Sequence, residues 1–153
     1  MRRITLTDYK KMIEKGLKLH KKKNYAQEIL WYNKIIKIQP NWANAYYRKG
    51  IAFLKLLKFS KAVFWLDKSL DVSNNRVCPI AVGTLYSKGR ALYHLGHYND
   101  ALFCYNKALD GLTLGNPMKC LNSDTIDSIN FILTEKVRVL QKFEKKEMIS
   151  NYE

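Results

Sequence analysis

Apolar residues recur every three or four positions along most of the chain, in stretches that short polar segments interrupt. This spacing places the apolar side chains on one face of an α-helix. The pattern predicts helices over residues 8–22, 25–38, 42–55, 59–72, 79–95 and 98–112, and a longer helix over residues 123–147. The sequence therefore predicts an all-α fold.

Turn-forming residues lie between the predicted helices. They are Lys23-Asn24, Pro40, Ser73-Asn74-Asn75-Arg76, Gly96-His97 and Gly115-Asn116-Pro117. We expect Thr7 or Asp8 to cap the first helix and Asn41 to cap the third, because these side-chain oxygens can accept a hydrogen bond from a free backbone N–H. Pro79 is compatible with the first turn of the fifth helix.

The predicted helices form pairs that repeat along the chain with a period of 34 residues. The first copy starts at Gly16 and the second at Gly50, and aromatic and aliphatic residues coincide when the two are aligned. A third copy starts at Gly89, and the polar segment 73–76 accommodates its five additional residues. A fixed period of this length is typical of helical repeat proteins, in which neighbouring pairs stack and bury a continuous core.

The repeated residues resemble the tetratricopeptide repeat (TPR) pattern, in which aromatic, glycine and alanine residues stand at fixed spacings. The matching residues are Met12, Gly16, Leu19, Glu28, Tyr32, Ile35 and Pro40 in the first copy, Tyr46, Gly50, Phe53, Ala62 and Leu66 in the second, and Leu85, Gly89, Leu92, Ala101, Tyr105 and Ala108 in the third. The resemblance covers about residues 8–113. It implies a TPR α-solenoid of three helix-turn-helix repeats plus a C-terminal capping helix.

We expect a single TPR domain over residues 8–147, with repeats at about 9–40, 43–74 and 80–113, a capping helix at 123–147 and a frayed tail at 148–153. The apolar face of the capping helix is predicted to consist of Ile126, Ile129, Leu133, Val137 and Leu140. Its opposite face is expected to be polar, as in the terminal helices of other repeat arrays.

Glycine at the matched position removes a Cβ where the two helices of a pair must approach closely. Glu28 and Ile35 depart from this rule, because they replace small residues in the first copy. A lysine precedes each glycine, namely Lys15, Lys49 and Lys88. Its stem is expected to lie along the groove between helices while its ammonium group reaches water.

The net charge of +14 is concentrated in the first part of the chain. Residues 1–40 contain 11 Lys/Arg and 3 Asp/Glu, whereas residues 122–153 contain 5 and 6. Such a positive region attracts acidic peptides, nucleic acid or anionic membranes, although scattered lysines also serve solubility. No apolar run approaches the roughly 18 residues of a membrane span. Three cysteines without a close pair favour reduced thiols and a cytoplasmic location.

No catalytic motif is present, so we expect a protein that is not an enzyme and has no metal or cofactor. His97 and Cys104 are two helical turns apart, but His97 lies in a predicted turn, which argues against a nucleophilic pair. His20 and His94 are interpreted as residues at the edge of the groove. Trp31, Trp65 and Cys104 share one phase of the repeat, and half-burial in the stack is favoured over an exposed aromatic stripe.

The TPR resemblance implies that the first helix of each pair lines a concave groove that binds a peptide. The candidate groove residues are Lys10, Glu14 and Lys21 in the first pair, Asn44, Tyr47, Arg48 and Lys55 in the second, and Tyr86, Arg90 and Tyr93 in the third. Tyrosine and arginine are favoured at binding hot spots. Arg48 and Arg90 are suited to bidentate pairing with an acidic partner.

Heat-shock co-chaperones of this family hold a C-terminal carboxylate with lysine, asparagine and arginine at fixed positions of three repeats. The matching positions here are occupied by Ile13, Leu17, Arg48, Gly83 and Ser87. This departure excludes that two-carboxylate clamp as such.

The predicted function is therefore a noncatalytic scaffold or adaptor that binds a peptide segment of another protein, an acidic one in particular. One alternative is nucleic-acid or ribonucleoprotein binding through the basic N-terminal half. A second alternative is a chaperone for a secreted or assembling partner. The sequence does not specify an oligomeric state.

Overall fold

The computed structural model describes residues 5–73, 79–113 and 123–150, and every regular element within them is an α-helix. The elements are α1 (Leu6–Lys21), α2 (Tyr25–Ile38), α3 (Ala43–Lys55), α4 (Phe59–Val72), α5 (Pro79–His94), α6 (Tyr98–Thr113) and α7 (Ser123–Ser150). The all-α prediction is thus confirmed. The loop predicted at 115–117 and most of the polar segment after Ser73 fall outside the described residues.

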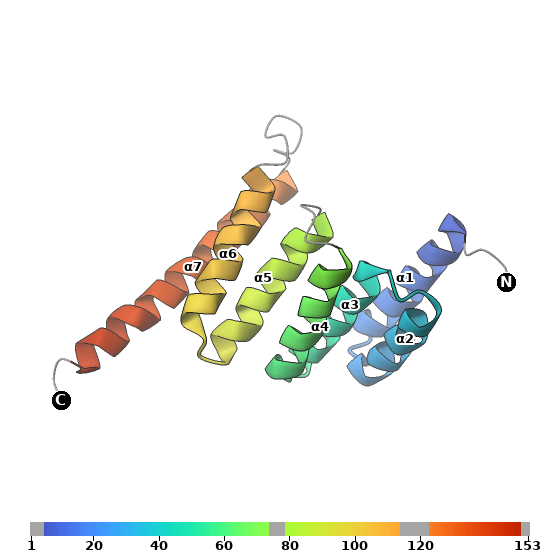
Figure 1. Ribbon diagram of the computed structural model, residues 1–153, viewed down its shortest axis with the longest axis horizontal. Helices are drawn as coiled ribbons and strands as arrows, with labels where there is room; N and C mark the ends of the chain where they lie inside the picture. The colour runs from blue at the N-terminus through green and yellow to red at the C-terminus, as the bar shows by residue number, and fades with distance from the viewer. Residues whose placement is uncertain (1–4, 74–78, 114–122, 151–153) are drawn as a thin grey trace.

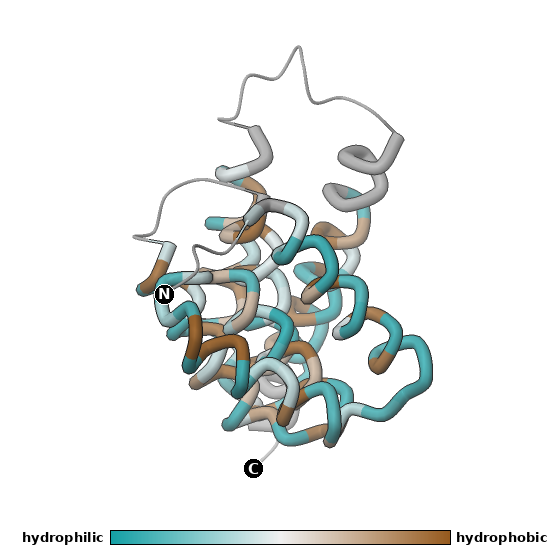
Figure 2. Tube along the Cα trace, turned by 90° about the vertical axis from the view of Figure 1, so that its right-hand side faces the viewer, coloured by the Kyte–Doolittle hydropathy of each residue, from teal (hydrophilic) through white to brown (hydrophobic). Residues whose placement is uncertain are grey.

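The helices lie side by side in chain order, with the two ends of the chain at opposite ends of the array (Figure 1). Each helix packs against the helices before and after it, so α1, α3, α5 and α7 form one layer and α2, α4 and α6 the other. Within the first layer α3 also contacts α5, and α5 contacts α7. Hydrophobic and hydrophilic segments alternate along the helices (Figure 2), as expected when amphipathic helices share one core.

The helix starts differ from two of the predicted caps. Thr5, not Thr7 or Asp8, caps α1, and its side chain accepts a hydrogen bond from the Asp8 backbone N–H at 3.3 Å. The Asp8 carboxylate in turn accepts from the Thr5 backbone N–H at 2.9 Å, which completes a capping box. Trp42 precedes α3 and makes no side-chain cap, so Asn41 does not have the predicted role.

The turn inside each pair has a residue with a left-handed backbone conformation at the same position of the repeat. Lys23, Leu57 and Gly96 have φ angles of 56°, 57° and 80°, and they occupy equivalent positions of the repeat. In each turn the next residue donates its backbone N–H to a carbonyl in the last turn of the preceding helix, over 2.9 to 3.0 Å. Each of these hydrogen bonds gives a donor to a backbone carbonyl at the end of the helix, where the helix itself provides none. Only the third pair has glycine, the residue that adopts this conformation without strain.

Glycine and alanine allow the helices of each pair to approach closely. A Cβ added at Gly50 would lie 2.7 Å from Leu66 Cγ, and one added at Gly16 or Gly89 would overlap the ring of Tyr32 or Tyr105. The residues on the facing helices are fully buried. The sequence-based explanation of the repeated glycines is therefore correct.

The prediction of which face of the capping helix α7 is buried is wrong. Ile132 and Val139 are buried against Tyr105 and the small residues of α6, whereas the predicted contacts Leu133, Val137 and Leu140 are 43%, 51% and 45% exposed. The side chains of Ile126 and Ile129 lie outside the described residues.

The error arises because α7 carries two apolar stripes, both with helical spacing. Periodicity identifies each stripe but does not decide which one faces the array. The helix also continues to Ser150, beyond residue 147, where the prediction ended it.

Candidate functional site: the groove of the first layer

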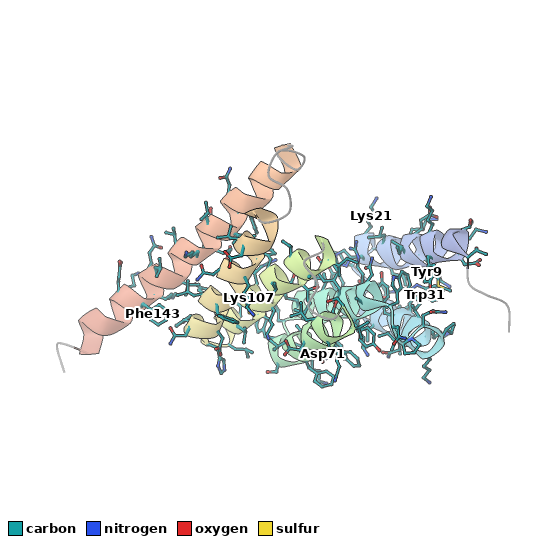
Figure 3. The ribbon with its side chains drawn as sticks, turned by 45° about the horizontal axis from the view of Figure 1, so that its top comes forward. Tyr9, Lys21, Trp31, Asp71, Lys107 and Phe143 are labelled. Atoms are coloured by element: carbon teal, nitrogen blue, oxygen red, sulfur yellow. The ribbon has the colours of Figure 1, made fainter. Side chains whose placement is uncertain are left out.

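The ten predicted groove residues come from α1, α3 and α5, which belong to the first layer. Those that are exposed are Lys10, Glu14, Lys21 and Lys55, and those that are partly buried are Asn44, Tyr47, Arg48, Tyr86, Arg90 and Tyr93. Figure 3 shows Lys21 at the end of α1, projecting away from the helices. The polar and basic residues of α1 are thus open to solvent, whereas the aromatic residues of α3 and α5 are held by packing.

Tyr47 and Arg48 lie where α3 meets its neighbours. The Tyr47 hydroxyl lies against Gly83 of α5, where an added Cβ would be 3.3 Å away. The guanidinium carbon of Arg48 lies 5.6 Å from the centre of the Tyr47 ring. Two atoms of this region, Arg48 Nε and Asn44 Oδ1, are buried and have no hydrogen-bond partner among the residues that the structure describes. One buried donor and one buried acceptor on α3 therefore lack a partner among these residues.

Tyr86 lies at the junction of α5 and α7. Its ring contacts Phe131 of α7 edge-on at 5.5 Å and Tyr105 of α6 at 6.1 Å. Burial raises the pKa of the Tyr86 hydroxyl to about 12, although Arg90 opposes this shift. The Arg90 guanidinium lies 5.9 Å from the centre of the Tyr86 ring. The structure therefore places this predicted groove pair beside α7.

A pocket of about 620 Å³ lies between α5 and α7. Tyr93 contributes from α5, and α7 contributes Arg138, Gln141, Lys142, Glu144 and Lys145. Three cations and one carboxylate from α7 give the pocket a positive charge. Arg138 is paired with Glu135 at 2.7 Å, whereas Lys142 and Lys145 are exposed.

Sequence analysis missed the contribution of α7 to this pocket. The signal was present, because Arg138, Gln141, Lys142 and Lys145 recur at spacings of three and four. It was interpreted as the polar outer face of a terminal helix. The structure instead places α7 in the same layer as α5, so its polar residues extend the groove-side surface.

A hydrogen-bonding contact between His20 and the buried carboxyl group of Glu28 joins the two helices of the first pair. Glu28 is 1% exposed, and its Oε2 lies 2.9 Å from Nδ1 of His20. Burial raises the pKa of the Glu28 carboxyl, while His20 and then Arg48 act in the opposite direction. His20 was predicted at the groove edge and is 26% exposed. The carboxylate at a small-residue position is thus tolerated because basic groups lie beside it.

The lysines that precede the glycines pack on the second helices. Lys15 Nζ lies 4.0 Å from the centre of the Trp31 ring, and Lys49 Nζ lies 3.1 Å from that of Trp65. Lys15 is exposed as predicted, but Lys49 is only 5% exposed. The expectation that each ammonium reaches water is therefore wrong for Lys49, and burial lowers its pKa to about 8.

In the third pair the tryptophan position is occupied by Cys104, and the lysine behaves differently. Lys88 forms an ion pair with Asp67 of the preceding pair. Trp31 and Trp65 are half-buried and Cys104 is buried, in agreement with the favoured interpretation of this phase. Burial raises the pKa of the Cys104 thiol, which disfavours the nucleophilic thiolate.

Other reactive groupings are not assembled in the described parts of the chain. His97 is 60% exposed and lies 3.8 Å from Asp100 rather than against Cys104. The described residues contain no group of three or more His, Cys, Asp or Glu side chains placed to hold a metal ion. Among these same residues, no helix combines the length and apolarity that crossing a membrane requires.

Comparison with known proteins identifies the repeat. The tetratricopeptide-repeat family profile matches residues 82–110, which include the third glycine and most of α5 and α6. A TPR repeat-containing protein of Methanocaldococcus jannaschii is 31% identical over 99 residues, which represent 63% of this chain and 16% of that protein. The chain therefore spans less than a fifth of this relative.

Solved structures have the same architecture. The TPR2B domain of yeast Sti1, in a complex with pHsp70, has a TM-score of 0.73 at 20% identity, over 87% of this chain and 96% of that one. The first TPR domain of Spaghetti (RPAP3), bound to the HSP90 peptide SRMEEVD, has a TM-score of 0.61 at 20% identity, over 80% and 88%. With the profile match over residues 82–110 and the helical array, these likenesses show that the chain has the fold of a tetratricopeptide-repeat solenoid.

Proposed function

We propose that this TPR protein is a noncatalytic adaptor that binds an acidic segment of another protein along α1, α3, α5 and α7. The observation that carries the proposal is the positive pocket between α5 and α7, lined by Tyr93, Arg138, Lys142 and Lys145. It combines an aromatic ring with several cations, a combination that favours a peptide bearing carboxylates beside apolar groups.

The similar structures support a peptide ligand. The HSP90 peptide held by the first TPR domain of Spaghetti has the sequence SRMEEVD, which carries two glutamates and one aspartate. At 20% identity this likeness concerns the fold, so the ligand class comes to the present chain only as part of the proposal.

The mode of binding is expected to differ from the two-carboxylate clamp of heat-shock co-chaperones. Ile13 and Leu17 cannot bind a carboxylate, and Gly83 has no side chain. Ser87 is 3% exposed, and its hydroxyl donates to the Gly83 carbonyl at 2.7 Å. The cations of α7, together with Arg48 and Arg90, are therefore the groups proposed to hold the acidic segment.

Fluorescence anisotropy with labelled SRMEEVD, with the same peptide amidated at its C-terminus, and with an uncharged version tests this proposal. The acidic peptide should bind more tightly than the uncharged one, and amidation should change the affinity little. Lys142→Gln/Lys145→Gln and Arg48→Ala/Arg90→Ala should each weaken binding by about tenfold or more. Equal binding of the acidic and uncharged peptides would contradict the proposal.

A parallel titration with labelled single-stranded RNA distinguishes the nucleic-acid alternative. Binding through the basic N-terminal half would weaken steeply with salt, because phosphate neutralisation releases counterions. Lys22→Gln/Lys23→Gln should flatten that dependence and leave peptide binding unchanged. Tight RNA binding that this variant abolishes, without peptide binding, would replace the adaptor function by the alternative.

A further inference from the structure

The second layer carries an exposed apolar side chain at one position of every pair. Leu30 of α2, Phe64 of α4 and Phe103 of α6 stand at the same distance from the glycine of their pair. They are 61%, 53% and 58% exposed. Because α2, α4 and α6 run in the same direction within one layer, these residues form a row across it, here called the outer row. Solvent-exposed large apolar groups in such a regular arrangement mark an interaction surface.

A row of lysines accompanies the outer row. Lys34, Lys68 and Lys107 follow the three apolar residues by four positions, and all three are exposed. Lys68 also lies 3.7 Å from Asp71 in an exposed ion pair. Residues four apart are neighbours on a helix surface. In α6 the contact is direct, because Lys107 Nζ lies 4.6 Å from the centre of the Phe103 ring. Each second helix thus presents the same pair of an apolar group and a cation.

Packing below the surface holds the middle of the row in place. The Phe64 ring meets the Trp65 ring edge-on at 5.1 Å. Trp65 is in turn fixed between Tyr46, at 6.1 Å, and the Lys49 ammonium, at 3.1 Å. Phe64 is therefore exposed on a rigid support, which reduces the entropy lost when a partner binds.

We propose that the outer row binds an acidic amphipathic helix of a partner protein. The apolar face of this helix would cover Leu30, Phe64 and Phe103, and its carboxylates would pair with the three lysines. This surface belongs to α2, α4 and α6, so it is separate from the groove of the first layer and adds a second binding function. A protein with two such surfaces would bring two partners together.

The small apolar area argues against a second copy of this chain as the occupant. Aromatic side chains bury about 150–250 Å² each. Three residues that are about half exposed therefore offer roughly 300 Å², less than the roughly 800 Å² per partner of a standard interface. A helix that gains part of its affinity from charge pairing fits this narrow row better than a homodimer does.

The charges of the same layer argue against an anionic membrane surface. Asp100 of α6 is 69% exposed, and a flat anionic bilayer would repel it, whereas Asp71 of α4 is paired with Lys68 at 3.7 Å. A segment that is one helix wide covers only the apolar row and the adjacent lysine row. The proposal therefore commits to a protein segment.

The probe is a labelled synthetic peptide of about 18 residues, long enough to form a helix on binding. It carries leucines along one face and glutamates beside them. A peptide of the same composition in scrambled order is the control ligand. Fluorescence anisotropy should show that the full-length protein binds the amphipathic peptide at least tenfold more tightly than the scrambled one.

The test variant is Leu30→Ser/Phe64→Ser/Phe103→Ser, which changes only exposed side chains. Its affinity should fall at least tenfold, with an unchanged far-ultraviolet circular dichroism spectrum. Its matched control is Leu133→Ser/Val137→Ser/Leu140→Ser, which removes as many exposed apolar groups from α7 and should bind as the wild type does. Lys34→Gln/Lys68→Gln/Lys107→Gln should weaken binding mainly at low salt.

Several results would overturn the proposal. They are equal loss of binding in the α7 control, loss in Arg48→Ala/Arg90→Ala, and failure of the wild type to prefer the amphipathic peptide. Binding to phosphatidylserine vesicles in place of the peptide would assign the row to a membrane. A dimer in light scattering that the outer-row variant dissociates would assign it to a second copy. Because the variants lie on separate layers, the groove proposal stands or fails independently.

Discussion

In each helix pair the two helices meet at an interface, here called the seam. The first and second pairs fill equivalent positions of the seam with polar and apolar side chains, respectively. In the second pair Leu54 is 6% exposed, and it belongs to the apolar cluster that contains the fully buried Ala62. At the equivalent positions of the first pair stand His20 and Glu28, joined at 2.9 Å. An alanine and a leucine have thus been replaced by a buried carboxylate and an imidazole without loss of the fold.

The comparison shows what a repeat position requires. It requires that the facing groups fill the space and leave no charge uncompensated, and either an apolar pair or an ionic pair can meet this condition. The ionic solution depends on more partners, because Arg48 of the next pair also acts on Glu28. It links the first pair electrostatically to the second, whereas the apolar solution of the second pair is local.

The same two pairs differ in their lysines. Each lysine places its ammonium group over the indole ring of a tryptophan, Lys15 over Trp31 and Lys49 over Trp65. Lys15 is exposed, whereas Lys49 is buried. The first pair stands at the end of the array, where one side of the stack is open to water. The second pair is covered on both sides, by α2 and by α5, so the lysine at the equivalent position, Lys49, is shielded from water.

The largest effect is expected for Gly50→Leu in the apolar seam of the second pair. Leu66 is fully buried at 2.7 Å from the added Cβ, so overpacking should lower the free energy of unfolding by about 3 kcal/mol or more. Urea unfolding measures this change. Gly16→Leu should cost less, because the new Cβ meets the end of the Tyr32 ring. Lys55→Leu, at an exposed site of the same helix, is the control. An unchanged free energy of unfolding in Gly50→Leu would contradict the close packing of Gly50 against Leu66.

The next effect is expected for His20→Leu, which leaves Glu28 buried beside Arg48 alone. Removing one partner of a buried ion pair is strongly destabilising, and partial exposure of His20 reduces this to about 2 kcal/mol. The double variant His20→Leu/Glu28→Ala recreates the residues of the second pair. It should regain most of the lost free energy of unfolding, and failure to do so would show that the two seams are not interchangeable.

A smaller effect separates Lys49 from Lys15 through pH. Burial lowers the pKa of Lys49 from 10.5 to about 8, so above pH 8 the unfolded state binds more protons than the folded state. The free energy of unfolding should therefore rise between pH 8 and 10.5, by at most about 3 kcal/mol, and by less because the Trp65 ring stabilises the cation. Lys49→Met should lack this rise, whereas Lys15→Met should retain it. Denaturant titrations across this range measure it.

The smallest effect concerns the pH dependence of the first pair. The pKa of Glu28 is raised from 4.5 by burial, so between 4.5 and the raised value the folded state binds more protons than the unfolded state. The contribution of Glu28 to stability should therefore decrease as pH rises through this window. His20 and Arg48 limit the decrease. Glu28→Gln should remove it, and identical pH profiles of Glu28→Gln and wild type would contradict the assigned pKa shift.

The sequence by itself determined the repeat. Helical spacing and the 34-residue period located the helices within a few residues, because one helix pair cannot bury its apolar face alone and must use the same contacts at every copy. The glycines, the small residues and the half-buried tryptophan phase followed from the same regularity. The ends of the helices were less certain, since the cap of α1 is Thr5, before the first apolar residue of the pattern.

Only the tertiary structure decided how the non-repeated parts are used. The sequence of α7 offers two apolar stripes, and the surface of α6 selects Ile132 and Val139 over Leu133, Val137 and Leu140. That choice turns the basic residues of α7 toward Tyr93, and their spacing in the sequence does not identify α5 as the helix with which they form the pocket. The partners of Glu28 and the burial of Lys49 also depend on helices distant in the chain. Periodicity fixes which residues share a face, but only packing against a neighbour determines which face is covered.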